Sequence, residues 1–173
     1  MTNYKQLLKK ISTFVFDVDG VLTNGSVLIA TDGEQQRTAN VKDGYALQYA
    51  VKKGFRIVIL SGGRSNCLQQ RFEYLGIKDI FLGIDNKLGI LKEYLKKNKI
   101  KKDEVLIMGD DIPDYEIMKH VDFACCPADA SEEIKAISKY ISDRKGGEGC
   151  VRDIIEQVMK VQGCWFDKDA FHW

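Results

Sequence analysis

Two aspartates stand one residue apart at the end of an apolar run. Residues 14–16 are followed by Asp17, Val18 and Asp19, and then by Gly20. Because side chains alternate between the two faces of a strand, Asp17 and Asp19 would point the same way if the strand continued. Two carboxylates held together repel each other, and a divalent cation would relieve that repulsion. The motif therefore indicates either a metal-dependent catalytic centre or an ordinary acidic turn, in which Asp and Gly are common.

A second acidic cluster follows a later apolar run. Residues 105–108 lead into Asp110 and Asp111, and Asp114 follows Pro113. Carboxylate oxygens are hard ligands that suit Mg²⁺ better than soft metals. The same residues could instead cap a helix, with the proline in its first turn.

Between these clusters lie groups that could bind a phosphate. An apolar run at 56–60 ends in Ser61 and Gly62, and Arg64 follows. A hydroxyl and free backbone N–H groups at a strand-to-helix junction can hold phosphate oxygens, although Ser is also a common helix N-cap. Lys87 stands near the start of a helical pattern, and a lone lysine is usually a solvated charge. These groups all lie at the carboxyl ends of expected strands, where ligands bind in open α/β sheets.

Apolar runs that alternate with helical patterns predict the elements that would position these residues. We expect strands near 13–17, 55–60, 80–82, 104–108, 122–124 and 139–141, and helices near 43–53, 64–75, 86–98, 113–119, 131–137 and 150–162. This alternation predicts an α/β fold of three layers, a doubly wound and mostly parallel sheet with helices on both faces. Asp32-Gly33 between two extended runs predicts a β-hairpin insertion. We expect no cap domain, because this insertion and the segment 64–87 are both too short.

Composition limits the classes of function. The chain has 173 residues and a formal net charge of +1, without a basic stripe, which argues against nucleic acid. We expect one domain over residues 1–173, with the hairpin at about 24–40 and a tail at about 163–173. No apolar run is long enough to predict a membrane span, and residues 1–10 lack the apolar core of a secretory signal, which favours the cytoplasm. The five cysteines lack metal-type spacing and fit reduced thiols.

The order of the motifs resembles that of the haloacid dehalogenase-like phosphatases. Their four motifs are matched in turn by Asp17-x-Asp19-Gly20-x-x-Thr23, Ser61, Lys87 and Gly109-Asp110-Asp111-x-x-Asp114. Residues 40–45 and 146–153 resemble segments of the 3-deoxy-D-manno-octulosonate 8-phosphate phosphatases, which hydrolyse an eight-carbon sugar-acid phosphate on the route to lipopolysaccharide. The resemblance implies a Rossmann-like, haloacid dehalogenase-like fold, a phosphoric monoester hydrolase and Mg²⁺ as cofactor. The alternative is a phosphatase for a nine-carbon, sialic-type sugar-acid phosphate.

The resemblance also implies roles for the motif residues. Asp17 would attack phosphorus and become a phospho-aspartate, and Asp19 would protonate the leaving oxygen and then activate water. Mg²⁺ would be held by Asp17, by the backbone carbonyl of Asp19 and by Asp110. Ser61 would hold the phosphate, and Lys87 would neutralise the transferring charge and pair with Asp17. Asp111 and Asp114 would support them by orienting the water or the lysine.

Further residues would bind the substrate. Arg64 and Arg71 lie seven apart on a predicted helix and could clamp a carboxylate or a phosphate, unless they belong to a solvated face. By resemblance, the other substrate-binding candidates are Asp19, Asn40, Lys42, Asp43, Gly44, Gly62 and Lys87.

The resemblance implies a homotetramer in which a neighbour's hairpin and tail close over the site. The aromatic residues near the end of the chain, Trp165, Phe166, Phe171 and Trp173, could take part in that contact or pack within their own chain.

A phospho-signalling receiver domain is an interpretation from another class. It also combines an acidic cluster, Mg²⁺, a hydroxyl and a lysine in an α/β sheet. A receiver would place its phospho-acceptor in the middle of the sheet order, whereas Asp17 lies on the first predicted strand.

Overall fold

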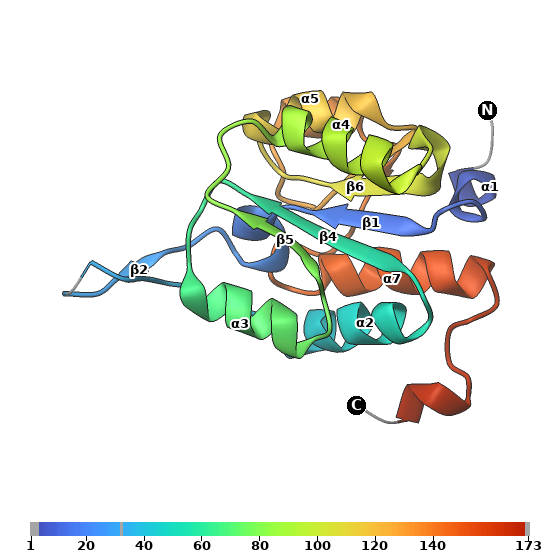
Figure 1. The fold of residues 1–173 in the computed structure, drawn as a ribbon, viewed down its shortest axis with the longest axis horizontal. Coiled ribbons are helices and arrows are strands. Elements are labelled where there is room, and N and C mark those ends of the chain that lie inside the picture. Colours follow the sequence, from blue (N-terminus) through green and yellow to red (C-terminus); the bar gives the residue numbers. More distant parts are fainter. Residues whose placement is uncertain (1–3, 32, 172–173) are drawn as a thin grey trace.

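Six strands form the centre of the molecule. The computed structural model describes residues 4–31 and 33–171. Its main sheet is parallel, in the order β5-β4-β1-β6-β7-β8. Figure 1 labels β5, β4, β1 and β6. The strands are β1 (Thr13–Phe16), β4 (Arg56–Ser61), β5 (Asp79–Leu82), β6 (Val105–Met108), β7 (Phe123–Cys126) and β8 (Tyr140–Ile141). The predicted mostly parallel sheet is confirmed.

Helices cover both faces of this sheet (Figure 1). One face packs against α1 (Tyr4–Leu8), α2 (Val41–Lys52), α3 (Asn66–Tyr74) and α7 (Cys150–Val161), and the other against α4 (Lys87–Asn98), α5 (Tyr115–His120) and α6 (Glu132–Ile137). Because strand side chains alternate, Phe14 and Phe16 enter the first core, and Val15 enters the second. The three predicted layers are therefore present.

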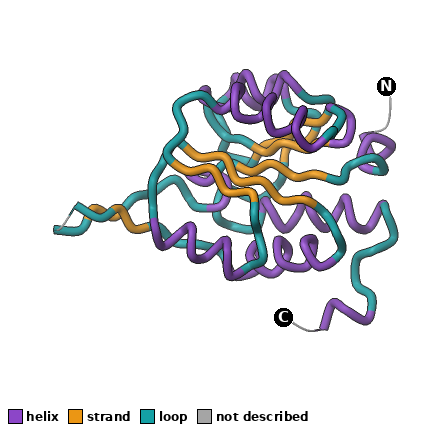
Figure 2. Tube along the Cα trace, in the orientation of Figure 1, coloured by secondary structure: helices purple, strands orange, loops and turns teal. Residues whose placement is uncertain are grey.

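A small hairpin projects from this three-layer body (Figure 2). Its strands are β2 (Leu28–Ile29) and β3 (Gln35–Gln36), which pair antiparallel as predicted. Asp32 of the predicted turn lies outside the described residues. Both strands are exposed to solvent, so the hairpin adds nothing to either core.

Short helical turns join several of these elements. They are η1 (Val18–Leu22), η2 (Lys102–Glu104), η3 (Ile112–Asp114) and η4 (Lys168–Phe171). Helix α3 begins later than predicted because Ser65 is its N-cap, and the Ser65 hydroxyl accepts the Leu68 N–H at 3.4 Å. Arg64 therefore precedes the helix and does not share a helix face with Arg71.

The tail packs along α2 of its own chain. Tyr49 donates its hydroxyl to Asp167 at 2.9 Å, and Lys53 forms ion pairs of 2.6 Å with both Asp167 and Asp169. The ring of Trp165 lies 5.4 Å from that of Tyr49, edge on. For the tail up to residue 171 the structure shows packing within the chain, and Trp173 lies outside the described residues.

Two other sequence expectations can be compared with this fold. All five cysteines are free. Over residues 4–31 and 33–171, every helix is too short or too polar to cross a bilayer.

Candidate active site

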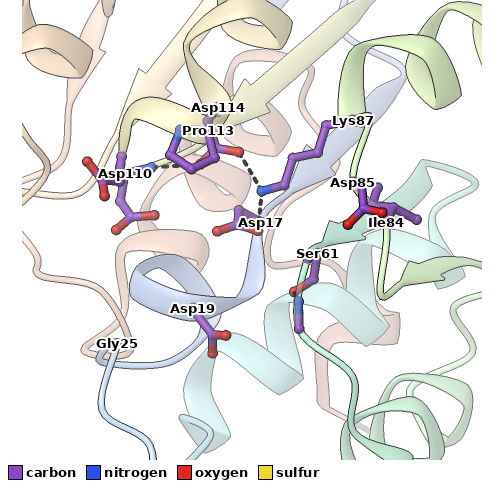
Figure 3. Close-up of a pocket in the computed structure, with 13 residues that line it drawn as sticks. Asp17, Asp19, Gly25, Ser61, Ile84, Asp85, Lys87, Asp110, Pro113 and Asp114 are labelled. Atoms are coloured by element: carbon purple, nitrogen blue, oxygen red, sulfur yellow. Dashed lines mark hydrogen bonds and ion pairs between the residues drawn. The ribbon is translucent and has the colours of Figure 1, made fainter.

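Three neighbouring strands end at one cavity. The carboxyl ends of β1, β4 and β6 carry Asp17, Ser61 and Asp110, and these strands are adjacent in the centre of the sheet. The cavity has a volume of about 450 Å³ and opens at this edge (Figure 3). Its lining includes these predicted residues: Asp17, Asp19, Ser61, Gly62, Lys87, Asp110, Asp111 and Asp114.

The central place of β1 corrects one step of the sequence argument. The first strand of the chain is also a middle strand of the sheet. Strand position therefore does not separate this chain from a receiver domain, and the distinction has to come from the relatives described below.

Lys87 joins two buried carboxylates at the floor of the cavity. Its ammonium group lies 2.7 Å from Oδ1 of Asp17 and 2.7 Å from Oδ1 of Asp114. Burial raises the pKa of Asp17 to about 6, the Asp114 carboxylate adds to the rise, and Lys87 opposes it. Burial alone would lower the pKa of Lys87, but the two carboxylates outweigh it and raise that pKa. The lysine is therefore a fixed positive charge beside Asp17.

Three carboxylates form a group that fits a divalent cation. Asp17, Asp110 and Asp114 each offer an oxygen, and these atoms lie within 4.8 Å of one another. Burial raises the pKa of Asp110 to about 7, and the negative charges of Asp17 and Asp114 add to this effect. Asp114 is already engaged, because its Oδ1 accepts from Lys87 and its Oδ2 accepts the Asp110 N–H at 3.3 Å. Of the three, Asp114 is thus the one with both carboxylate oxygens engaged, while Asp17 has one oxygen bound by Lys87.

Gly20 allows the first motif to approach the second. Its φ is +87°, and a Cβ at this position would overlap the carboxylate of Asp110. The η1 turn is closed by Thr23, whose N–H donates to the Val18 carbonyl at 3.0 Å and whose hydroxyl lies 3.4 Å from Asp19 Oδ1. The first motif therefore forms a tight turn in which Gly20 leaves room for the Asp110 carboxylate and Thr23 closes the backbone hydrogen bonding.

Asp19 faces a residue that sequence reasoning missed. Because β1 ends at Phe16 and a turn follows, the Asp19 carboxylate does not lie beside those of Asp17 and Asp110 (Figure 3). Arg37 binds it through two hydrogen bonds, Nε to Oδ1 at 2.6 Å and Nη2 to Oδ2 at 3.0 Å. In the sequence Arg37 is one of 26 lysines and arginines, and nothing local distinguishes it from a solvated cation.

Ser61 stands on the side of the cavity opposite Asp110 (Figure 3). The residue is only 3 % exposed, and its hydroxyl oxygen accepts the Gly63 N–H at 3.1 Å. Gly62 lies beside it in the cavity wall. A hydroxyl with neighbouring backbone amides at a strand end has the chemistry to hold phosphate oxygens.

The other predicted residues lie outside this cavity. Asn40 caps α2 through the Lys42 N–H at 2.8 Å and donates its side-chain amide to the Gly147 carbonyl at 3.1 Å. Asp43 is 1 % exposed and accepts the Arg152 N–H at 2.7 Å, and burial raises its pKa to about 6. In this structure Asn40 joins α2 to the segment before α7, and Asp43 joins α2 to the first turn of α7.

Arg64 and Arg71 lie in two different places. Arg64 lines a second cavity beside the first, and its side chain lies against Gly83. Arg71 lies over Gly44, where an added Cβ would be 2.6 Å from its Nη2. The structure therefore does not bring the two arginines together as a clamp.

Comparisons with known proteins place the chain among phosphatases. Residues 79–154 match the model of a family described as haloacid dehalogenase-like hydrolases. The 3-deoxy-D-manno-octulosonate 8-phosphate phosphatase KdsC of Escherichia coli K12 is 30% identical over 155 residues, which cover 90% of this chain and 82% of that protein.

Solved structures agree with this assignment. A crystal structure of the phosphatase of the same name from Yersinia pestis is 29% identical, with a TM-score of 0.90, covering 92% of this chain and 86% of that one. Its counterpart from Moraxella catarrhalis, in complex with a magnesium ion, a phosphate ion and a KDO molecule, is 32% identical, with a TM-score of 0.91, covering 99% and 97% of the two chains. The chain therefore belongs to the haloacid dehalogenase-like hydrolases, in the family of the 3-deoxy-D-manno-octulosonate 8-phosphate phosphatases, and is a phosphoric monoester hydrolase.

Proposed function

We propose that this enzyme hydrolyses 3-deoxy-D-manno-octulosonate 8-phosphate to the free sugar acid and phosphate. The observation that carries this proposal is the placement of Asp17 in the cavity, paired with Lys87 and next to Asp110. The cavity thus combines a nucleophile, a cation and a metal site. The family relationship supports the identity of the substrate.

In the proposed reaction Asp17 is the nucleophile. Its carboxylate forms a bond to phosphorus as the bond from phosphorus to the sugar oxygen breaks, and Asp19 gives a proton to that oxygen. Water then attacks phosphorus, Asp19 takes the proton from the water, and the bond from phosphorus to Asp17 breaks. Ser61 and the backbone of Gly62 hold phosphate oxygens, and Lys87 fixes Asp17 and offsets negative charge.

The residues of the site fit Mg²⁺. Asp17, the backbone carbonyl of Asp19 and Asp110 would hold it, and when bound it would screen Asp17 from the phosphate and withdraw charge from the transferring group. Asp111 and Asp114 would support the ligands and Lys87. Asn40, Lys42, Asp43, Gly44, Arg64 and Arg71 remain candidates for the sugar end of the site, although they lie outside the cavity described above.

The assembly is part of the same proposal. We propose a single domain that forms a homotetramer in the cytoplasm, with sites near the subunit interfaces, and acts in the synthesis of lipopolysaccharide precursors. Leu28 and Ile29 on the hairpin are 67% and 72% exposed, an apolar surface that a neighbouring subunit would cover. Light scattering should then give four times the chain mass of 19.6 kDa.

A steady-state assay of phosphate release tests the function. We expect many turnovers per enzyme, complete loss on chelation by EDTA, and recovery with Mg²⁺. The eight-carbon substrate should exceed a nine-carbon keto-deoxy acid phosphate in kcat/KM, and a tenfold advantage of the nine-carbon compound would assign the enzyme to the sialic-type substrate instead.

Asp17→Asn should stop turnover while the fold is retained, and an active variant would exclude the covalent route.

A further inference from the structure

The hairpin of the chain places an arginine against the proposed proton donor. The Arg37 guanidinium binds both oxygens of Asp19, at 2.6 and 3.0 Å. Its remaining contacts are to Gln35, with Nη1 3.1 Å from the backbone oxygen and Nη2 3.4 Å from the side-chain oxygen. Four contacts thus hold the guanidinium in one orientation, with its flat edge toward a carboxylate.

The contact between Arg37 and Asp19 lies at the junction of two cavities. The second cavity, of about 550 Å³, is lined by hairpin residues 33–35 and by residues 62–66, and it shares Gly62 and Gly63 with the first. A Cβ at Gly63 would lie 3.1 Å from both Arg37 Nη2 and Asp19 Oδ2, and 3.5 Å from Ser61 Oγ. Since a phosphate would sit in the first cavity, the rest of the substrate would extend past Arg37 into the second.

The ion pair between Arg37 and Asp19 is incompatible with the proton transfer proposed for Asp19. Arg37 binds both carboxylate oxygens of Asp19 and so fixes the direction of this side chain, and the pair has to open before Asp19 can turn toward a leaving oxygen. If Arg37 releases the Asp19 carboxylate, its guanidinium needs another group that accepts two hydrogen bonds. An unpaired charge in a partly desolvated site would otherwise cost free energy. A second carboxylate offers the same planar pair of oxygens and fits the same edge of the guanidinium.

We propose that Arg37 is a specificity-determining residue that exchanges the carboxylate of Asp19 for the carboxylate of the sugar-acid substrate. The exchange recognises the end of the substrate remote from the phosphate and releases Asp19 at the same time. A phosphate ester without a carboxylate leaves Arg37 on Asp19 and is turned over poorly. This inference rests on the proposed function, because it requires a substrate that carries both groups.

A matched pair of substrates tests the exchange. The first is 3-deoxy-D-manno-octulosonate 8-phosphate, and the second is its carboxamide, which has the same leaving group and no carboxylate. In the wild-type enzyme we expect at least a tenfold preference in kcat/KM for the acid. Arg37→Ala should lower kcat/KM for the acid by tenfold or more, chiefly through KM. It should raise kcat for the carboxamide, because Asp19 is then no longer held by Arg37, and Arg37→Lys should restore part of the preference.

Several results would overturn the inference. One is an equal loss on both substrates, which would make Arg37 a support for Asp19 alone. Another is an unchanged preference in Arg37→Ala. Weaker inhibition of this variant by inorganic phosphate would show that Arg37 binds the phosphate instead. Failure of the proposed function looks different, because the wild-type enzyme would then prefer an unrelated phosphate over both members of the pair.

The matched control is Arg56→Ala. Arg56 is exposed at the start of β4, at the opposite end of this strand from Ser61, and contacts Asn98 at 3.2 Å. Its removal changes the net charge as Arg37→Ala does. We expect it to leave the preference for the acid unchanged, and a lost preference in this variant would attribute the effect to net charge and contradict the role of Arg37. Thermal unfolding of each variant confirms that it is folded.

Discussion

The Lys87 ammonium lies 2.7 Å from Oδ1 of Asp17, although the two residues are 70 positions apart in the chain. Lys87 is the first residue of α4, and Asp17 directly follows β1. The contact therefore depends on the helix starting at the carboxyl end of the sheet, beside the strand that carries the proposed nucleophile. Burial alone raises the pKa of Asp17 and makes its carboxylate hard to ionise. The positive charge of Lys87 opposes this effect.

Replacement of Lys87 should affect both catalysis and stability. Lys87→Met removes the charge between Asp17 and Asp114, and we expect kcat to fall by about 10²–10³-fold, as for the loss of one charge-stabilising donor. Breaking a buried ion pair should also lower the free energy of unfolding by roughly 3 kcal/mol. Phosphate release and urea unfolding measure the two effects. Lys92→Met, at an exposed position of the same helix, should change neither, and an equal loss in that variant would contradict the assignment.

Asp110 should govern metal affinity. Because burial and neighbouring charges raise its pKa to about 7, Mg²⁺ has to displace a proton from this group, and its affinity should fall as the pH drops below 7. Asp110→Asn should weaken Mg²⁺ binding by more than about tenfold, as measured by calorimetry with the ion alone. Asp143→Asn is the control, since the side chain of Asp143 is 83% exposed and lies outside the cavity and the group of three carboxylates. Equal losses of Mg²⁺ affinity in the two variants would contradict the role of Asp110 as a metal ligand.

Gly146 should be required for the shape of η1, the turn whose Asp19 carbonyl is a proposed ligand of Mg²⁺. The segment before α7 lies against η1, where the Gly147 N–H donates to the Val21 carbonyl at 2.9 Å. A Cβ at position 146 would overlap the carbonyl oxygen of Gly20. Gly146→Ala should cost about 1–3 kcal/mol in the free energy of unfolding and raise the Mg²⁺ concentration needed for half-maximal activity.

Gly54→Ala provides the comparison for Gly146. Gly54 has a φ of +87° with nothing within 4 Å of an added Cβ, so it carries only the conformational cost. Its replacement should lower stability without altering the response to Mg²⁺. The same Mg²⁺ response in both variants would contradict a link between Gly146 and the proposed metal site at η1.

Because Asp43 is buried, we expect the free energy of unfolding to depend on pH through this side chain. Its pKa rises to about 6 in the folded protein, so the folded state holds a proton that the unfolded chain releases near pH 4. This contribution favours folding below about pH 4 and is lost as the pH rises through 6. Relative to Asp43→Asn, the wild-type protein should lose on the order of 3 kcal/mol in the free energy of unfolding between pH 4 and pH 7.

The control for this titration is Asp143→Asn. The side chain of Asp143 is 83% exposed, so its replacement should give a difference from wild type that is flat with pH. Urea unfolding at a series of pH values measures both curves. A flat difference for Asp43→Asn would show that Asp43 is ionised freely in the folded state.

The sequence contained enough information for the sheet and for most of the cavity. Apolar runs that end in Asp17, Ser61 and Asp110 identify both the strands and the edge where they end, because parallel strands deliver their carboxyl ends to one side. The apolar face of α7 was also predictable from its helical spacing, and Val151, Ile154 and Val158 are fully buried. These features depend on local periodicity, which a single sequence displays.

Contacts set by the path of a loop were not predictable in this way. The bidentate contact of Arg37 with Asp19 depends on how the hairpin leaves the sheet, and no local pattern encodes that direction. The burial of Asp43 depends on the packing of α2 against α7, which are distant in sequence. The start of α3 did have a local signal, since Ser65 is a preferred N-cap, and it places Arg64 outside the helix.

The docked tail should stabilise the chain without taking part in turnover by that chain. The Arg152 guanidinium packs against two rings, 5.3 Å from the centre of Trp165 and 5.5 Å from the centre of Tyr45. Trp165→Ala removes one of these faces and the packing against Tyr49, and we expect a loss of about 1–3 kcal/mol in the free energy of unfolding, with kcat within twofold of wild type. Phe166→Ala is the control, because this ring is 72% exposed and should contribute less. If Trp165→Ala lowered kcat while the stability was retained, the tail would instead act at the active site of a neighbouring subunit.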